Sequence, residues 1–172
     1  IKPILKRFIT LSILHFVLWF EAEKMWEFKF YKVNDDYDFM SNFAPYPFSD
    51  GSKIWPTSEH YFQAQKFLVP QIQEKFRQIA SPMDAALEGR NRQNPLRPGW
   101  EEVKDEVMLQ ALRMKFSQNP EIAKELLATG DAILIEHTRN DAYWADGGDG
   151  SGKNKLGLLL MQVREELKNS IL

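Results

Sequence analysis

Hydrophobic and polar residues follow two periods along this chain, one typical of strands and one typical of helices. At residues 26–31, aromatic side chains alternate with Glu27 and Lys29, which is the pattern of a half-buried strand. The run at 132–136 is short and apolar, and it predicts a buried strand. Residues 41–52 are rich in proline and serine and contain Asp-Gly, so they predict a loop or a short hairpin.

Helical spacing of apolar residues, often preceded by a capping residue, covers most of the remaining chain. Thr57 or Ser58 can cap one helix, and Ser81-Pro82 provides the start of another. The predicted helices cover the segment after Ser58, about 71–80, about 82–90, 100–116, 119 to about 130, and about 155–168. Because no internal repeat or interdomain linker interrupts this order, we predict a single α+β domain, mainly helical with a few short strands.

The first 24 residues have a different pattern. Basic residues precede an apolar run at 8–20, which is the order found in secretory signals. However, the run is short for a membrane-spanning helix, and no small-x-small cleavage site follows it. We therefore expect residues 1–24 to be an upstream extension and residues 25–172 to form the domain. A signal or a membrane anchor is the alternative.

Deletion of residues 1–24 is expected to leave activity and melting temperature unchanged within error, because their apolar run shows neither strand alternation nor a capped amphipathic helix. Thermal melts of the full-length and shortened chains would test this. A melting temperature several degrees lower in the shortened chain would show that the segment packs on the domain. Vesicle binding by the full-length chain alone would favour the anchor.

Composition excludes several classes of protein. The chain has 172 residues, of which 44% are hydrophobic, and this argues against disorder. Its formal net charge of -2 gives no general attraction to nucleic acid or membrane, so an anionic ligand requires a local basic cluster. The absence of cysteine excludes disulfides, Cys-ligated zinc and a Cys nucleophile. The three histidines are widely separated, and we expect neither a metal nor a cofactor.

The segment at 55–67 contains the strongest candidate for catalysis. On a helix, Glu59, Gln63 and Lys66 lie at i, i+4 and i+7 and share one stripe, with aromatic residues on its flanks. A carboxyl group and an amine between aromatic rings lose solvent, which moves the pKa of each toward neutrality. The pattern therefore predicts an acid/base residue paired with a nucleophile. A solvated helix face with a charge pair is the alternative.

A basic cluster and a glycine-rich loop are the candidates for holding an anionic ligand. Arg90, Arg92 and Arg97 precede Trp100, so guanidinium groups suited to a phosphate adjoin an indole suited to a planar base. Surface arginines beside a core tryptophan are the alternative. The loop at 146–154 leads into a helix, where backbone N–H groups favour a phosphate, unless it is only a mobile surface loop.

The sequence of this loop excludes two known ligand-binding motifs. It nearly matches the phosphate loop of nucleotide hydrolases, but Asn154 stands where a hydroxyl would bind magnesium, which excludes an NTPase. EF-hand calcium binding is excluded because the alternate acids and the closing glutamate are missing. Asp141 and Asp146 flank Trp144 and can hold ribose hydroxyls or cap turns. We expect His60 to be a packed, hydrogen-bonded residue.

Several segments together resemble the NADAR, or YbiA-like, family. They read DFMSNF from residue 38, WPTSEHYFQAQK from 55, GRNR from 89, and NDAYWADGG from 140 through KNKLG from 153. The resemblance covers about residues 28–168. It implies an α+β, mainly helical fold and an enzyme that hydrolyses the N-glycosidic bond between a base-like amine and a phosphorylated ribose.

The resemblance implies two possible substrate classes. One branch of the family releases ribose 5-phosphate from phosphoribosylamino-pyrimidines, the early intermediates of riboflavin synthesis. The other removes ADP-ribose from guanine in nucleic acid or from other acceptors. The stand-alone domain favours a cytoplasmic enzyme of the first branch. A non-catalytic ADP-ribose-binding module is a third hypothesis, against which intact Glu59 and Lys66 argue.

The resemblance also implies roles for individual residues. Glu59 would be the acid/base residue, and Lys66 the amine that captures the sugar C1 as an imine. Trp100 would stack on the ligand. The other expected substrate contacts are Asn42, Arg90, Asp141, Trp144, Asp146 and Asn154. The first-turn position of Glu59 favours its charged form, whereas burial favours the neutral form, and the sequence does not decide between them.

Overall fold

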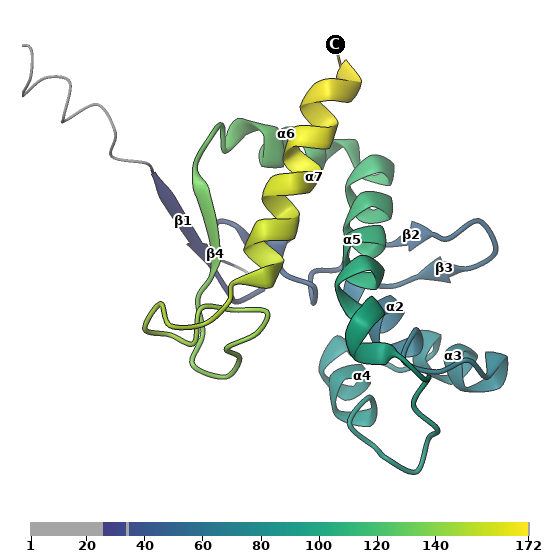
Figure 1. Cartoon of the computed structure of the whole chain (residues 1–172). Coiled ribbons are helices and arrows are strands. Elements are labelled where there is room, and N and C mark those ends of the chain that lie inside the picture. Colours follow the sequence, from purple (N-terminus) through teal and green to yellow (C-terminus); the bar gives the residue numbers. More distant parts are fainter. Residues whose placement is uncertain (1–25, 34, 172) are drawn as a thin grey trace, which may run out of the picture.

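The computed structural model describes residues 26–33 and 35–171 (Figure 1). The predicted extension at 1–24 lies outside this part of the chain. The elements in chain order are β1 (Glu27–Phe30), the 3-10 helix η1 (Asp38–Met40), β2 (Phe48–Ser49), β3 (Ile54–Trp55), α2 (Ser58–Ala64), α3 (Pro70–Arg77), α4 (Pro82–Glu88), α5 (Trp100–Gln118), α6 (Pro120–Ala128), β4 (Ile133–Glu136) and α7 (Lys155–Ile171). This is the predicted α+β, mainly helical single domain. Within the described residues, no helix is long and apolar enough to cross a bilayer.

Strands β1 and β4 form a parallel pair in which Phe30 lies opposite Glu136 at the carboxyl end. Successive side chains of a strand point to opposite faces. Leu134 is therefore fully buried with Phe30 in the core, whereas Ile133 and Ile135 on the other face are half-buried. The alternating pattern predicted for β1 is confirmed within Glu27–Phe30, but it fails at Trp26, which precedes the strand and is 79% exposed. The apolar run of β4 is buried on one face only, because its other face borders a cavity described below.

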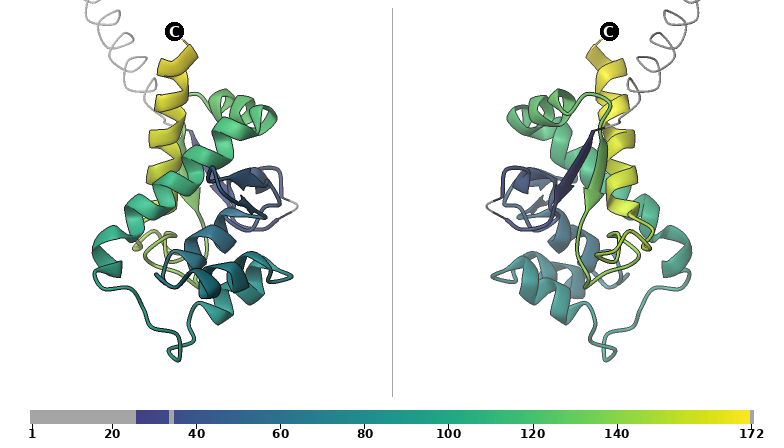
Figure 2. Two further views of the ribbon diagram at one scale, coloured as in Figure 1. Left: turned by 90° about the vertical axis from the view of Figure 1, so that its right-hand side faces the viewer. Right: turned by 90° about the vertical axis from the view of Figure 1, so that its left-hand side faces the viewer.

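The chain just before α7 forms hydrogen bonds with the edge of β4 that does not pair with β1. Asn154 has a φ of 46°, a left-handed conformation that asparagine tolerates better than most residues. Its side-chain oxygen accepts from the Glu136 N–H at 3.0 Å, and its side-chain nitrogen donates to the Leu134 carbonyl at 2.8 Å. At Gly157, a β-carbon would lie 2.0 Å from that same carbonyl oxygen, so only glycine allows α7 to approach this closely. Figure 2 shows α7 running beside the sheet.

The segment before α2 contains the predicted hairpin, formed by the antiparallel strands β2 and β3. The Asp50 carboxylate accepts from the Trp55 indole at 2.8 Å and so fixes the hairpin. Lys115 of α5 is completely buried and donates to the carbonyl oxygens of Phe39 and Ser41 at 2.6 and 2.9 Å. This lysine therefore ties α5 to the chain segment that leads into the candidate site.

The helix starts predicted from capping residues are confirmed. Thr57 caps α2 and Ser81 caps α4, each through a side-chain oxygen that accepts a backbone N–H three residues later. Proline begins α3, α4 and α6. A proline at this position loses no hydrogen bond, because the first N–H groups of a helix have no partner within the helix.

Helix α2 is shorter than the predicted stripe. It ends at Ala64, so Lys66 lies in the following turn and not on the helix with Glu59. The Lys66 N–H donates to the Gln63 carbonyl three residues back, which tightens the turn. The chain must then become extended before Pro70, which disfavours a helical residue at the position preceding it.

The apolar core consists of two clusters that meet along α2 and α5. Phe62 and Leu112 belong to the larger cluster with the sheet and α7. Ala64 and Ala111 belong to the smaller cluster with α3, α4 and the hairpin. Burial of each large apolar side chain contributes about 1.5–3 kcal/mol. Helix α2 is thus held from two sides, and its first turn has a fixed position.

Candidate active site

The candidate site forms where α2 begins, near the end of α4, the start of α5 and the loop between β4 and α7 (Figures 1 and 2). The Thr57 cap places Glu59 in the first turn of α2, where its side chain is buried. The Glu59 N–H donates to the Asn42 carbonyl at 3.0 Å. One Glu59 carboxyl oxygen accepts from the Gln63 side-chain amide at 2.7 Å. Both the main chain and the side chain of Glu59 are therefore anchored.

Burial raises the pKa of Glu59 above its ordinary value of 4.5. The hydrogen bond from Gln63 and the charges of Lys66 and Arg90 act in the opposite direction, and the charge of Asp141 acts with burial. Burial therefore dominates over the effects that favour the charged form. Glu59 keeps a proton to higher pH than an ordinary glutamate, as an acid catalyst requires.

Lys66 reaches the same region from the turn after α2. Its Nζ donates to the Gly89 carbonyl at 3.3 Å. Burial lowers the pKa of Lys66 below its ordinary value of 10.5, and the positive charges of Arg92 and Arg90 add to this effect, whereas Glu59 opposes it. A lysine nucleophile must be neutral for part of the time, so the net lowering of the Lys66 pKa favours that chemistry.

Phe62 is the centre of an aromatic cluster beside this pair. Its ring centroid lies 5.1 Å from that of Trp100 and 5.3 Å from that of Trp144, and the Lys66 Nζ lies 5.8 Å from it. Trp100, expected to stack on the ligand, is only 6% exposed and belongs to the core. Trp144 is half-buried and is the more accessible indole. Phe67, expected on one flank of the stripe, stacks on a phenylalanine of the other cluster.

Three more of the predicted contact residues lie near the pair. The Asp141 carboxylate accepts from the N–H groups of Tyr143 and Trp144 at 2.7 Å each, so it caps the turn that carries the indole. Arg90 is exposed, and its charge reaches both Glu59 and Lys66. The side-chain oxygen of Asn42 is buried without a hydrogen-bond partner among the described residues.

Glu136 is a carboxyl group of this site that the sequence analysis missed. It ends β4 and is half-buried, and burial raises its pKa to about 8, with further contributions from Asp141, Glu59 and Asp146. The Glu136 carboxyl group is therefore protonated in most molecules at neutral pH, and a protonated carboxyl group can donate a hydrogen bond. The alternation of side chains along β4 could have identified Glu136 from the sequence. A glutamate two residues after the buried Leu134 points to the same face of the strand.

Three glycine N–H groups of the glycine-rich loop are already hydrogen-bonded within the loop. The N–H groups of Gly148, Gly150 and Gly152 donate to Asp146, at 2.8, 3.1 and 2.8 Å. These three bonds do not favour a phosphate cradle, which stays a prediction. The loop instead holds Asp146, whose carboxylate lies 2.7 Å from the His137 Nδ1.

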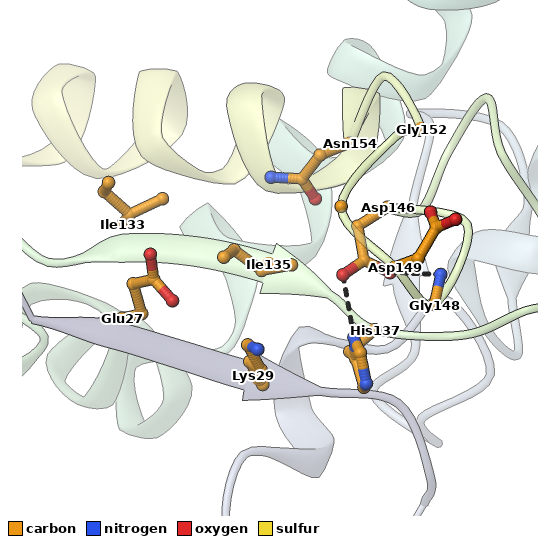
Figure 3. Close-up of a pocket in the computed structure, with 11 residues that line it drawn as sticks. Glu27, Lys29, Ile133, Ile135, His137, Asp146, Gly148, Asp149, Gly152 and Asn154 are labelled. Atoms are coloured by element: carbon orange, nitrogen blue, oxygen red, sulfur yellow. Dashed lines mark hydrogen bonds and ion pairs between the residues drawn. The ribbon is translucent and has the colours of Figure 1, made fainter.

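A cavity of about 510 Å³ lies on the face of the β1–β4 sheet that points away from the core (Figure 3). It is lined by Glu27, Lys29, Ile133, Ile135, His137, Asp146, Gly148, Asp149, Gly150, Gly152 and Asn154. Two predicted substrate contacts, Asp146 and Asn154, border this cavity, and the Asn154 amide is already bound to β4. Glu59 and Lys66 are not among the residues that line this cavity, and the roles of Asp146 and Asn154 as substrate contacts stay predictions.

His60 is the packed, hydrogen-bonded histidine that we expected. Its Nδ1 lies 2.8 Å from the Thr57 hydroxyl, and its Nε2 lies 3.1 Å from the Ile79 carbonyl. Burial lowers the pKa of His60, which favours a neutral ring at physiological pH. Its role is to fix the first turn of α2, and through it the position of Glu59.

Comparisons with known proteins show the family to which this chain belongs. The model of the NADAR domain matches residues 29–168. N-glycosidase YbiA of Shigella boydii is 59% identical over 80% of this chain and 86% of its own, and that of Escherichia coli K12 is 58% identical over the same shares. The NMR structure of E. coli YbiA superposes with a TM-score of 0.80 and covers 87% of this chain and 89% of its own, at 54% identity. This chain therefore belongs to the NADAR domain family, and it is an N-glycosidase, a hydrolase of N-glycosyl bonds.

Proposed function

We propose that this enzyme hydrolyses the bond between ribose 5-phosphate and the amino group of a pyrimidine intermediate of riboflavin synthesis, in the cytoplasm. The observation that carries the proposal is that Glu59, with a raised pKa, and Lys66, with a lowered pKa, lie close enough to shift each other. The substrate class is supported by a relative from Vibrio vulnificus named a riboflavin biosynthesis protein, which is 45% identical over 81% of this chain and 38% of its own.

The proposed reaction has two stages. The neutral amine of Lys66 forms a bond to the sugar C1, and the C1–N bond to the pyrimidine amine breaks as Glu59 gives its proton to that nitrogen. The free aminopyrimidine leaves, and Glu59 takes a proton from the nitrogen that now joins Lys66 to C1. The ribose ring then opens: the C1–O4 bond breaks, Glu59 gives the proton to O4, and the sugar stays on Lys66 as an imine. Water then adds to C1 and the C–N bond to Lys66 breaks, which releases ribose 5-phosphate and restores the lysine.

The surrounding side chains fit the parts of such a substrate. Arg90 and Arg92 supply guanidinium groups for the 5-phosphate. Trp144 supplies the accessible aromatic face for the pyrimidine, while Trp100 supports Phe62 from the core. Hydrogen-bond acceptors for the ribose hydroxyls come from Asn42, whose buried oxygen lacks a partner among the described residues, and from Asp141. Protonated Glu136 adds a donor.

Incubation of the purified full chain with each substrate class tests the proposal. Release of ribose 5-phosphate from a phosphoribosylamino-pyrimidine, followed by chromatography or mass spectrometry, is the expected result. Turnover of ADP-ribosylated guanine alone would overturn the substrate assignment in favour of the ADP-ribose branch. Tight binding of ADP-ribose with no product from either class would indicate a binding module instead.

A further inference from the structure

Gly89 follows α4 in a conformation that does not require glycine. Its φ of -64° and ψ of -12° are helical values that any residue adopts. Glycine is in fact less favourable than alanine in such a conformation, because it loses more conformational freedom on folding. The reason for a glycine must therefore lie in what a side chain would touch.

A β-carbon on Gly89 would overlap the side-chain amide of Gln63. It would lie 1.8 Å from the Gln63 Oε1 and 2.7 Å from its Cδ, whereas its third neighbour, the Ala85 carbonyl oxygen, is 3.3 Å away. Gln63 is buried, and its Oε1 has no hydrogen-bond partner among the described residues. The amide thus lies in a space that exists only because Gly89 has no side chain.

The nitrogen of the Gln63 amide forms a hydrogen bond with Glu59, the candidate acid. The Gln63 Nε2 donates to a Glu59 carboxyl oxygen at 2.7 Å, across the i, i+4 spacing of α2. The amide nitrogen of Gln63 therefore faces Glu59, and its oxygen faces Gly89. The orientation of the Glu59 carboxyl group consequently depends on the space at Gly89.

We propose that Gln63 and Gly89 act together as positioning residues for Glu59: the bare Cα of Gly89 makes room for the Gln63 amide, and that amide fixes the carboxyl group. The role in catalysis rests on the proposed function of Glu59. The Gly89 carbonyl also accepts from the Lys66 Nζ at 3.3 Å, so one residue adjoins both members of the pair.

A double-mutant cycle on the full chain tests the coupling, using Gly89→Ala, Gln63→Ala and both together. Gly89→Ala alone is expected to lower kcat about 100-fold, since displacement of a catalytic group by about 1 Å costs about that much. In the Gln63→Ala background, Gly89→Ala should change kcat less than twofold, because no amide remains to be displaced.

Thermal stability and carboxyl titration give readouts that do not depend on turnover. Gly89→Ala should lower the melting temperature of the native chain but raise that of Gln63→Ala by about 1–4 °C, since the backbone accepts alanine. A ¹³C NMR titration should show a higher pKa for Glu59 in either single variant, because the hydrogen bond that favours its charged form is lost. The Glu59 signal is assigned by its absence in Glu59→Gln.

Gln110→Ala is the matched control, because Gln110 donates to Glu106 at 2.6 Å across the same i, i+4 spacing on the exposed side of α5. It should leave kcat and the titration of Glu59 unchanged. Equal losses from Gly89→Ala in both backgrounds would overturn the inference. If instead the titration and stability follow the cycle but kcat does not, the positioning stands and the catalytic role of Glu59 is wrong.

Discussion

Replacement of Glu59 by glutamine is expected to lower kcat by a factor of about 10² to 10⁴ while the fold is kept. Glutamine has the same size and can still accept from the Gln63 amide, which donates to Glu59 at 2.7 Å. It cannot transfer the proton that the leaving nitrogen requires. Steady-state kinetics with the substrate that proves to be turned over would measure the loss.

The pH dependence of stability shows whether the Glu59→Gln variant is folded and whether Glu59 is buried as described. A carboxyl group whose folded pKa lies above its unfolded value contributes stability at low pH, and this contribution is lost as the pH rises through the folded pKa. The pKa of Glu59 is raised by burial. The variant should therefore melt higher than the native chain at pH 8, and this difference should shrink at pH 5.

Glu106→Gln provides the control for both measurements. Glu106 has the same i, i+4 glutamine partner but lies exposed on α5, so its replacement should alter neither kcat nor the pH dependence of melting. Near-normal turnover of Glu59→Gln with an unchanged fold would show that Glu59 only stabilises the first turn of α2. The proton donor would then have to be sought at Glu136, the second carboxyl group with a raised pKa.

The sequence predicted the elements of this fold well because their local signals agree with their tertiary surroundings. Thr57 and Ser81 cap helices from sequence rules alone, since a capping hydrogen bond spans only three residues. The end of α2 was mispredicted because the pattern of polar residues continues to Lys66, whereas the backbone turns before Pro70. A periodic pattern does not show where a helix stops.

The site was predicted less completely, because its members come from separate elements. Glu59 and Lys66 share one segment, so the sequence could pair them, and in the structure each affects the pKa of the other. Glu136 acquires its raised pKa only when the fold buries it and brings other carboxyl groups near it. Conversely, Asn154 belongs to a family motif, but both groups of its amide bind the edge of β4. A sequence motif therefore does not show whether a residue supports the fold or contacts the substrate. The contacts in the structure are needed to distinguish these two roles.

The two shifted pKa values explain how Glu59 and Lys66 could work as a pair. Catalysis needs enzyme molecules in which Glu59 is protonated and Lys66 is neutral. Such molecules are a minority whenever the carboxyl group has the lower pKa, because it then loses its proton before the lysine does. With the ordinary values of 4.5 and 10.5, such molecules would be about one part in a million. Burial moves the two values toward each other, and each unit of convergence raises the population about tenfold. Activity should therefore fall at both low and high pH.

Lys66→Arg is expected to abolish most activity and all covalent capture of the sugar. Arginine keeps the positive charge beside Gly89 and Phe62, but it stays protonated and cannot form the imine. Borohydride added to the native enzyme during turnover should reduce the imine and leave a stable sugar-phosphate adduct. Mass spectrometry should map this adduct to the peptide containing Lys66, and Lys66→Arg should not trap it.

The other lysines make this trapping experiment discriminating. Lys115 also has a pKa lowered by burial, to about 7, but it is completely buried and donates to two carbonyl oxygens, so it should not be labelled. Lys168→Arg, in an exposed ion-pair cluster on α7, is the matched control and should trap the sugar as the native chain does. Full turnover by Lys66→Arg, or an adduct on Lys153 or Lys155, would contradict the imine mechanism. Lys66 would then be a charge partner for the substrate, and Glu59 would have to activate water directly.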